Sequence, residues 1–201
     1  MKLYIVRHGE TISNASGITQ GHKNSKLSKQ GEKQAELLAN RLKNVKFDYI
    51  YSSDLLRAKQ TTKSILKNRN CPVKYVKALR ERNMGMFSGR PMHEYREYIE
   101  KNNLYGKIHK RIPNGGESIY SLQKRIIDFS EKIYKKHKND TVLFSTHGGI
   151  KKFFLMHLNG IKLNDWKNYT VRFENTSLSV IKFHENKKHE IILENCTDHL
   201  K

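Results

Sequence analysis

The sequence has few of the residues that crosslink or divide a chain. Only two cysteines, Cys71 and Cys196, occur among 201 residues, and no CxxC pair is present. That pattern argues against a disulfide framework and against a zinc cluster. Only three prolines occur, and no internal repeat or low-complexity linker divides the chain. We therefore expect a single domain over residues 1–201, long enough to bury a substantial core.

Long apolar runs are also missing. No stretch approaches the roughly 18 apolar residues of a membrane-spanning helix. The opening run from Met1 to Val6 is too short, and wrongly flanked, for a secretory signal. The sequence therefore predicts a cytoplasmic protein with no membrane partner.

Acidic residues are few relative to basic ones. The chain has 19 Asp and Glu against 39 Lys and Arg, a formal net charge of +20. Such a field attracts phosphorylated substrates or nucleic acid, because both depend on the same Coulomb attraction. The lysines are spread along the whole chain, and no RGG tract, RNP-like aromatic strip or zinc-finger spacing accompanies them. We interpret the charge mainly as a compositional bias and do not expect a nucleic-acid partner.

Predicted strands and helices alternate along the chain. Short apolar runs predict strands at residues 3–6, 49–51, 73–76, 141–145, 177–183 and 189–193. Helical spacing predicts helices over residues 28–45, 55–66, 92–103, 117–137 and 150–158. Ser28 is the expected N-cap of the first helix, and Ser52, Ser53 and Asp54 those of the second. Residues 12–27 are polar and are expected to form a loop. The alternation predicts an α/β fold, a three-layer sandwich with a mainly parallel central sheet and helices on both faces.

Three predicted strands end in residues capable of chemistry. Arg7 and His8 follow the first strand, Arg57 follows the second at the start of a helix, and His147 follows the strand at 141–145. In open sheets of this kind, ligands bind outside the carboxyl ends of the strands. We therefore expect these side chains to meet at one site.

Five segments form a recognisable series. The first is Arg-His-Gly-Glu-Thr at residues 7–11, and the others lie at 52–61, 79–81, 115–118 and 146–149. An Arg-His-Gly tripeptide alone is a weak signal. In this order the segments resemble the motifs of the histidine phosphatase superfamily, the phosphoglycerate mutase-like family, over nearly the whole chain.

The resemblance implies a histidine acid-type phosphatase that needs neither metal nor cofactor. His8 would be the nucleophile and would become phosphohistidine. Arg7 and Arg57 would stabilise the charge on the phosphoryl oxygens, because an arginine fork donates two hydrogen bonds and stays charged. His147 would bind the same oxygens through an N–H. Glu81 would protonate the leaving oxygen and then take a proton from water.

Other residues would support these five. The resemblance assigns substrate positioning to Asn14, Gln20, Gly21 and Gly148. The ring nitrogen of His8 that does not attack must donate to a backbone carbonyl, that of Gly9 or Gly148. We expect Arg80 and Arg82, which flank Glu81, to face away from the site. A paired-metal interpretation of the two histidines is disfavoured, because no carboxylate-rich ligand spacing accompanies them.

The substrate is not evident from the sequence beyond a small-molecule phosphomonoester. Residues 82–114 form a short insert, predicted to be a small helical cap over the carboxyl ends of the strands. Phosphoglycerate mutases carry a longer insert, so hydrolysis is favoured and mutase activity is the alternative.

The relatives suggested are broad-specificity and α-ribazole phosphatases. A second alternative is a non-catalytic phosphate- or RNA-binding protein on the same scaffold, and either a monomer or a homodimer is compatible with the sequence. Candidate specificity residues in the cap are Met84, Met86, Phe87, Met92, Tyr95, Tyr98, Tyr105 and His109.

Overall fold

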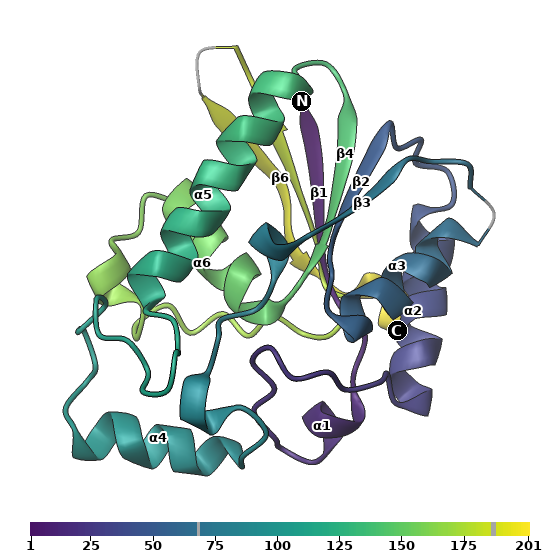
Figure 1. Cartoon of the computed structure of the whole chain (residues 1–201). Coiled ribbons are helices and arrows are strands. Elements are labelled where there is room, and N and C mark those ends of the chain that lie inside the picture. Colours follow the sequence, from purple (N-terminus) through teal and green to yellow (C-terminus); the bar gives the residue numbers. More distant parts are fainter. Residues whose placement is uncertain (68, 186–187) are drawn as a thin grey trace.

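A mixed six-stranded sheet runs through the centre of the protein (Figure 1). The structure, a computed structural model, describes residues 1–67, 69–185 and 188–201. The strand order is β3-β2-β4-β1-β5-β6; β1 to β4 are parallel, and β5 and β6 are antiparallel to their neighbours. The mainly parallel sheet is thereby confirmed. The strands are β1 (Lys2–Arg7), β2 (Tyr49–Ser53), β3 (Val73–Val76), β4 (Thr141–Thr146), β5 (Leu178–Phe183) and β6 (His189–Cys196).

Alternating side chains of β1 divide the core between the two faces of the sheet. Leu3 and Ile5 pack with α5 (Ile119–Lys136) and α6 (Gly148–Leu158). Tyr4 and Val6 point to the opposite face, where α2 (Lys29–Leu42) and α3 (Leu56–Leu66) cover them. Burying one such side chain contributes roughly 1.5–3 kcal/mol. Helices on both faces, as Figure 1 shows, complete the predicted three layers.

The predicted helix caps hold for one helix and fail for another. Ser28 caps α2, because its side chain accepts a hydrogen bond from the backbone N–H of Gly31. α3 instead begins after Leu55, which makes no side-chain cap hydrogen bond. The caps expected at Ser52 and Asp54 do not form, because Ser52 donates to the carbonyl of Ser53 and Asp54 pairs with Arg80. Partners distant in sequence compete successfully for these polar groups.

A short helix, α1 (Ile12–Ala15), lies within the segment predicted to be a loop. Its cap is reciprocal: Thr11 accepts from the backbone N–H of Asn14, and the Asn14 side chain accepts from that of Thr11. The capping box makes one turn of helix stable where apolar spacing gives no signal. This turn stands directly after the Arg7-His8 dipeptide.

The insert at residues 82–114 forms the predicted cap. It contains η2 (Gly85–Phe87) and α4 (Met92–Lys101), and Figure 1 shows α4 beyond the carboxyl ends of the parallel strands. The cap has a small core of its own, formed by Met84, Phe87 and Ile112. Its backbone follows η1 (Lys77–Leu79), which leads from β3 to Glu81.

The closing segment contains η3 (Leu163–Asp165), the β5-β6 hairpin and η4 (Asp198–Leu200). The turn predicted at 185–188 lies partly outside the described residues. Within the described parts of the chain, no helix combines the length and the apolar character needed to cross a membrane.

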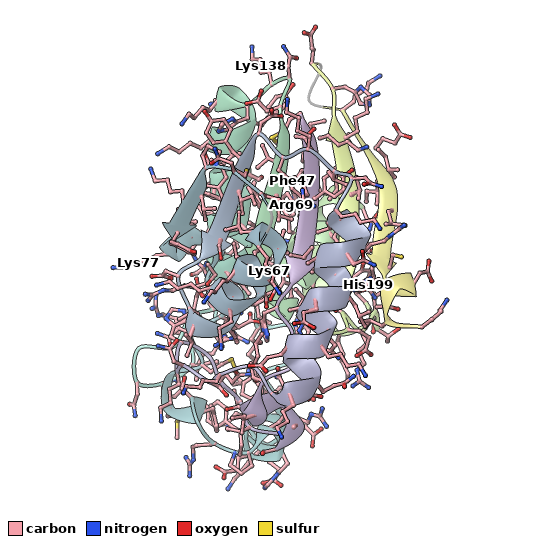
Figure 2. The ribbon with its side chains drawn as sticks, turned by 90° about the vertical axis from the view of Figure 1, so that its right-hand side faces the viewer. Phe47, Lys67, Arg69, Lys77, Lys138 and His199 are labelled. Carbon is pink, nitrogen blue, oxygen red and sulfur yellow. The ribbon has the colours of Figure 1, made fainter. Side chains whose placement is uncertain are left out.

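Arg69 ties two loops together towards the amino ends of the strands. Its guanidinium lies 5.3 Å from the centre of the Phe47 ring, and Figure 2 shows the two side chains near each other. Its N–H groups also donate to the carbonyls of Val45 and Leu42. These contacts fix the loops that enter β2 and β3, well away from the carboxyl ends where His8 stands.

Gly31 is required where α2 meets the loop after β1. A Cβ on Gly31 would stand 1.9 Å from the carbonyl oxygen of Glu10. We expect Gly31→Ala to lower the free energy of unfolding by about 1–3 kcal/mol, the range for overpacking. The sign is opposite to that of helix propensity, which favours alanine by about 1 kcal/mol. Urea unfolding measures the effect, and Lys33→Ala on the exposed side of α2 is the control. An unchanged or raised stability for Gly31→Ala would contradict this close contact.

Candidate active site

Five side chains predicted from separate segments meet at the carboxyl end of the sheet. Arg7 ends β1, His8 follows it, Arg57 lies in the first turn of α3, and His147 precedes α6. The Nε of Arg57 lies 3.2 Å from Nε2 of His8 and 3.1 Å from Nδ1 of His147. The two imidazole ring centres are 5.1 Å apart. Glu81 joins the group from the segment after η1, through the contact with α6 described below.

One ring nitrogen of His8, the one that faces Arg57, is unprotonated. Its Nδ1 lies 2.7 Å from the carbonyl oxygen of Gly9, which can only accept, so Nδ1 carries the proton. Nε2 is therefore unprotonated and accepts from Arg57. Of the two carbonyls proposed from the sequence, that of Gly9 makes the contact. Burial lowers the pKa of His8 well below its ordinary value, and the charges of Arg57 and Arg7 lower it further. His8 is thus a neutral ring at pH 7.

His147 is held in the opposite tautomer. Its Nδ1 faces the Nε–H of Arg57 and must accept, so Nε2 carries the proton and donates to Oγ of Ser53 at 2.8 Å. Burial lowers its pKa well below the ordinary value, and the charge of Arg57 adds to the effect. In this geometry His147 presents a lone pair to the site and not the expected N–H.

Arg57 is almost fully enclosed at 1% exposure, and its guanidinium is fixed on every side. Besides the two histidines, it donates to the carbonyl oxygens of Gly21 at 2.9 Å and Lys23 at 3.1 Å. Burial lowers its pKa to about 10, so it remains charged at neutral pH. A planar donor with four acceptors around it has a single orientation.

Arg7 supplies the second positive charge and keeps donors available. One terminal nitrogen donates to the carbonyl of Phe173 at 2.6 Å. Its Nε is buried and has no hydrogen-bond partner among the described residues. Gly148 lies beside it, and a Cβ there would stand 3.4 Å from Nε of Arg7, an ordinary van der Waals distance. An unsatisfied buried donor beside a neutral histidine is suited to an anionic oxygen.

The Glu81 carboxylate is held at the amino end of α6. Its Oε2 accepts from the backbone N–H of Gly149 at 3.0 Å, and its Oε1 from that of Arg82 at 2.8 Å. A Cβ at 149 would stand 2.3 Å from Oε1, so a larger residue there would displace the Glu81 carboxyl group from this position. The helix N-terminus favours negative charge at this point.

Both arginines that flank Glu81 in sequence have partners elsewhere, as expected. Arg80 forms a two-bonded pair with Asp54, each bond 2.6 Å long. Arg82 donates to the carbonyl of Glu117 and to the hydroxyl of Tyr95. Neither guanidinium is directed at the Glu81 carboxylate.

The four residues expected to position substrate are placed differently from one another. Gly21 contacts Arg57 through its carbonyl, and Gly148 lies against Arg7. The Asn14 oxygen is occupied by its bond to Thr11. Gln20 is buried at 9% exposure, and its Oε1 has no partner within the described residues. In the part of the chain that the structure describes, neither Asn14 nor Gln20 forms a hydrogen bond with the five central residues.

Several supporting residues escaped sequence reasoning. Thr61 accepts from the backbone N–H of Gly9 and donates to the carbonyl of Arg57, which joins the His8 loop to α3. Ser53, expected only as a cap, is the partner of His147. The loop at residues 173–177 forms hydrogen bonds with the side chain of Arg7 and with the backbone carbonyl of His8. The sequence gives one signal for these supporting residues: Ser53 and Thr61 each lie four residues from Arg57.

The aromatic residues of the cap mostly pack against each other. The ring of Phe87 lies 5.5 Å from that of Tyr95 and 5.1 Å from that of Tyr98, centre to centre. Phe87 is 3% exposed and Met84 is 8% exposed. These side chains form the core of the cap, so their ring character says little about the substrate.

The two histidines are expected to resist protonation in solution. Because burial and Arg57 lower both pKa values, the ring carbons of His8 and His147 should show no titration in NMR spectra between pH 8 and pH 6. In the urea-unfolded chain both should titrate near about 6.5. A midpoint at or above that value for either folded histidine would contradict the neutral tautomers.

The same shifts link stability to pH. Below about pH 6.5 the histidines of the unfolded chain bind protons, whereas the buried rings of His8 and His147 stay neutral. The free energy of unfolding therefore falls as pH falls. The expected loss is on the order of 1 kcal/mol per pH unit for each histidine. Urea unfolding at pH 7.5 and pH 5.5 measures it, and a flat profile would contradict it.

Comparison with known proteins agrees with this geometry. The family model of the histidine phosphatase superfamily (branch 1) matches residues 3–196. A metal-independent phosphoserine phosphatase of Arabidopsis thaliana is 39% identical over 168 residues, which cover 78% of this chain and 68% of that protein. Phosphoserine phosphatase 1 of Hydrogenobacter thermophilus is 34% identical over 100% of this chain and 94% of its own length. The solved structure of Bacillus stearothermophilus YhfR superimposes with a TM-score of 0.91 at 26% identity, covering 100% of this chain and 99% of that one.

Proposed function

The chain belongs to the histidine phosphatase superfamily and to its phosphatases, and we propose that it hydrolyses phosphomonoesters without a metal ion, through a phosphohistidine on His8. One observation carries the proposal. A buried guanidinium, that of Arg57, stands between two neutral imidazoles, 3.2 Å from His8 and 3.1 Å from His147. The arrangement combines a nucleophilic lone pair with a fixed positive charge at one point.

In the first half-reaction Nε2 of His8 attacks phosphorus in line with the leaving oxygen. A P–N bond forms, and the P–O bond to the leaving group breaks. Nδ1 keeps its proton and its hydrogen bond to the Gly9 carbonyl. The phosphorylated ring is therefore a cation, and the negative charge of the phosphoryl group balances it. Arg57 and the free donors of Arg7 bind the equatorial oxygens, where charge is greatest.

His147 changes protonation state as the phosphoryl group binds. A phosphate dianion beside Nδ1 favours uptake of a proton from water onto that nitrogen, because nearby negative charge stabilises an imidazolium, and the proton returns to water when phosphate leaves. Nδ1 and Nε of Arg57 then both donate to a phosphoryl oxygen placed between them. Ser53 keeps the ring orientation throughout, through its contact with Nε2.

Glu81 acts once as acid and once as base. Protonated, it gives its proton to the leaving oxygen, and the alcohol departs. As a carboxylate, it takes a proton from a water molecule, whose oxygen attacks phosphorus and breaks the P–N bond. Phosphate leaves, and His8 regains its lone pair. The backbone N–H of Gly149 holds the carboxyl group for both steps.

We propose a small phosphomonoester of the phosphoserine kind as substrate. The two relatives with 39% and 34% identity are both phosphoserine phosphatases, which supports this choice. The cap is short, and its aromatic residues fill their own core. Lysines are spread along the whole chain, and nitrogen-tipped side chains project around the outline of the molecule in Figure 2. The positive charge therefore serves general attraction of anions, and a specific RNA surface is not proposed.

The test is turnover of p-nitrophenyl phosphate and phosphoserine in the presence of excess EDTA. Hydrolysis of both, unchanged by chelation, is expected, with activity retained in mild acid because His8 stays neutral. If neither is hydrolysed, the protein is assayed with 2,3-bisphosphoglycerate and 3-phosphoglycerate. Phosphoryl transfer in that assay alone would establish a mutase and overturn the proposal. Activity that requires an added metal would also overturn it.

A further inference from the structure

We propose that Lys151 is a positioning residue that sets the two catalytic histidines at their working separation, an inference that rests on the proposed function. Lys151 lies on α6, one turn after His147, and does not line the phosphoryl site. It joins the helix that carries His147 to the loop that holds His8 and Arg7.

The amine of Lys151 is completely enclosed. The residue has 0% exposure, and its Nζ donates to the carbonyl oxygen of Ser177 at 2.6 Å and to its Oγ at 2.9 Å. The ring centre of Phe173 is 5.5 Å from Nζ. Both anchoring contacts therefore fall within the loop at residues 173–177.

That loop is the support of the Arg7-His8 dipeptide. The Ser177 carbonyl also accepts from the backbone N–H of Arg7 at 3.2 Å. Asn175 donates to the carbonyl of His8 from its side chain at 3.0 Å, and Thr176 from its backbone at 3.3 Å. Phe173 accepts from the Arg7 guanidinium. Displacement of this loop moves the nucleophile and the first arginine together.

The other end of the connection is His147. The backbone N–H of Lys151 donates to the His147 carbonyl at 3.0 Å, in the first turn of α6. A single side chain thus spans from the helix of one histidine to the backbone support of the other. The pairing of β1 with β4 also joins the two segments, and the backbone N–H of His8 donates to the carbonyl of Thr146 at 3.0 Å. Lys151 adds a second connection, from α6 to the loop on the other side of the Arg7-His8 dipeptide.

Lys151 is an unfavourable residue for packing alone. No ion pair involves it within the described residues, so burial of its charge is not compensated by a carboxylate. Burial lowers the pKa of its amine well below the ordinary value, with a contribution from the charge of Arg7. Its two hydrogen bonds are both directed at oxygens of Ser177. An apolar side chain of the same length would avoid the cost of burial but could not hold the loop.

The loop needs such a hold because its conformation is unfavourable. Thr176 has a φ of 58°, in the left-handed region that side chains with a branched Cβ avoid. Its hydroxyl is also contacted at 3.2 Å by Nε2 of His199, which Figure 2 labels on η4. Lys151 and His199 therefore restrain adjacent residues of one strained loop.

The deciding experiment compares Lys151→Met with Lys152→Met. Methionine keeps the length of the chain and removes the donor. Lys152, next on the same helix, lies over the rings of Trp166 and Tyr169 and provides the matched control. We expect Lys151→Met to lower kcat about 10- to 100-fold with KM changed less than about threefold, since a misplacement near 1 Å costs on the order of 100-fold. Lys152→Met should match the unaltered protein in both.

Two further measurements keep a structural defect apart from a positioning role. Lys151→Met should unfold at the same or a higher temperature than the unaltered protein, while the NMR ring signals of His8 and His147 shift. Ser177→Ala removes one acceptor and should lower kcat about fivefold. Equal kcat for Lys151→Met and Lys152→Met, or a loss of kcat in proportion to lost folded protein, would overturn the inference. Lack of turnover by the unaltered protein would instead refute the proposed function. In that case the role of Lys151 is still tested by NMR, because unshifted ring signals of His8 and His147 in Lys151→Met would refute it.

Discussion

Replacement of His8 by alanine is expected to lower phosphatase kcat by at least about ten-thousandfold, the range seen when a nucleophile is deleted. Both imidazoles present an unprotonated nitrogen to Arg57, so the paired variant His147→Ala is the comparison: under the proposed roles it should retain the phosphohistidine that His8→Ala loses. The His8→Ala variant keeps Arg7 and Arg57, the two arginines proposed to bind the phosphoryl oxygens. Inorganic phosphate should therefore still protect it against thermal unfolding.

The covalent intermediate provides the direct test. Brief mixing with 32P-labelled substrate should leave label on the unaltered protein, stable in base and lost in acid, as expected of a phosphoramidate. His8→Ala should carry no label. Residual activity within tenfold of the unaltered protein, or label of equal intensity on the variant, would place the nucleophile elsewhere.

Arg57→Lys is expected to lower kcat/KM by about a thousandfold or more, the effect of losing an arginine that stabilises a transferring phosphoryl group. Lysine keeps the charge but cannot donate simultaneously towards His8, His147 and the carbonyl of Gly21. Arg69→Lys is the matched control, because Arg69 also donates to backbone carbonyls but lies far from His8. The control should retain full activity.

A second readout separates electrostatics from geometry. Burial is the largest cause of the low pKa of His8 and His147, and the charge of Arg57 is the next. Arg57→Gln should therefore raise both pKa values in the NMR titration, whereas Arg57→Lys should raise them less. If Arg57→Gln lowers the rate but raises the pKa of neither histidine, Arg57 does not act on the two rings through its charge.

Much of the architecture follows from local pattern. The alternation of Leu3, Tyr4, Ile5 and Val6 predicts a strand with two buried faces, and the structure places these residues in the two halves of the core. Helical spacing predicts α2 to α6 with small errors at their ends. The short helix α1 was missed because a capping box, and not an apolar face, stabilises it.

The five central site residues could also be named from the chain, because each lies in a contiguous motif that resembles one of a known family, and four of them stand at or just after a strand end. Their surroundings could not. Ser53 was expected as a helix cap and is instead the partner of His147, and Lys151 gave no signal within an apolar helix.

The sequence by itself determined the fold class and the convergence of Arg7, His8, Arg57 and His147 at one edge of the sheet, because both follow from periodicity and from the ends of the strands. Glu81 and the roles of all five residues came from contiguous motifs that resemble those of the histidine phosphatase superfamily. Only the tertiary structure decided the tautomers of His8 and His147, the orientation of Arg57 and the grip of the 173–177 loop. Each of these is set by hydrogen bonds between groups far apart in sequence, which form only when the assembled sheet brings those groups together and excludes water.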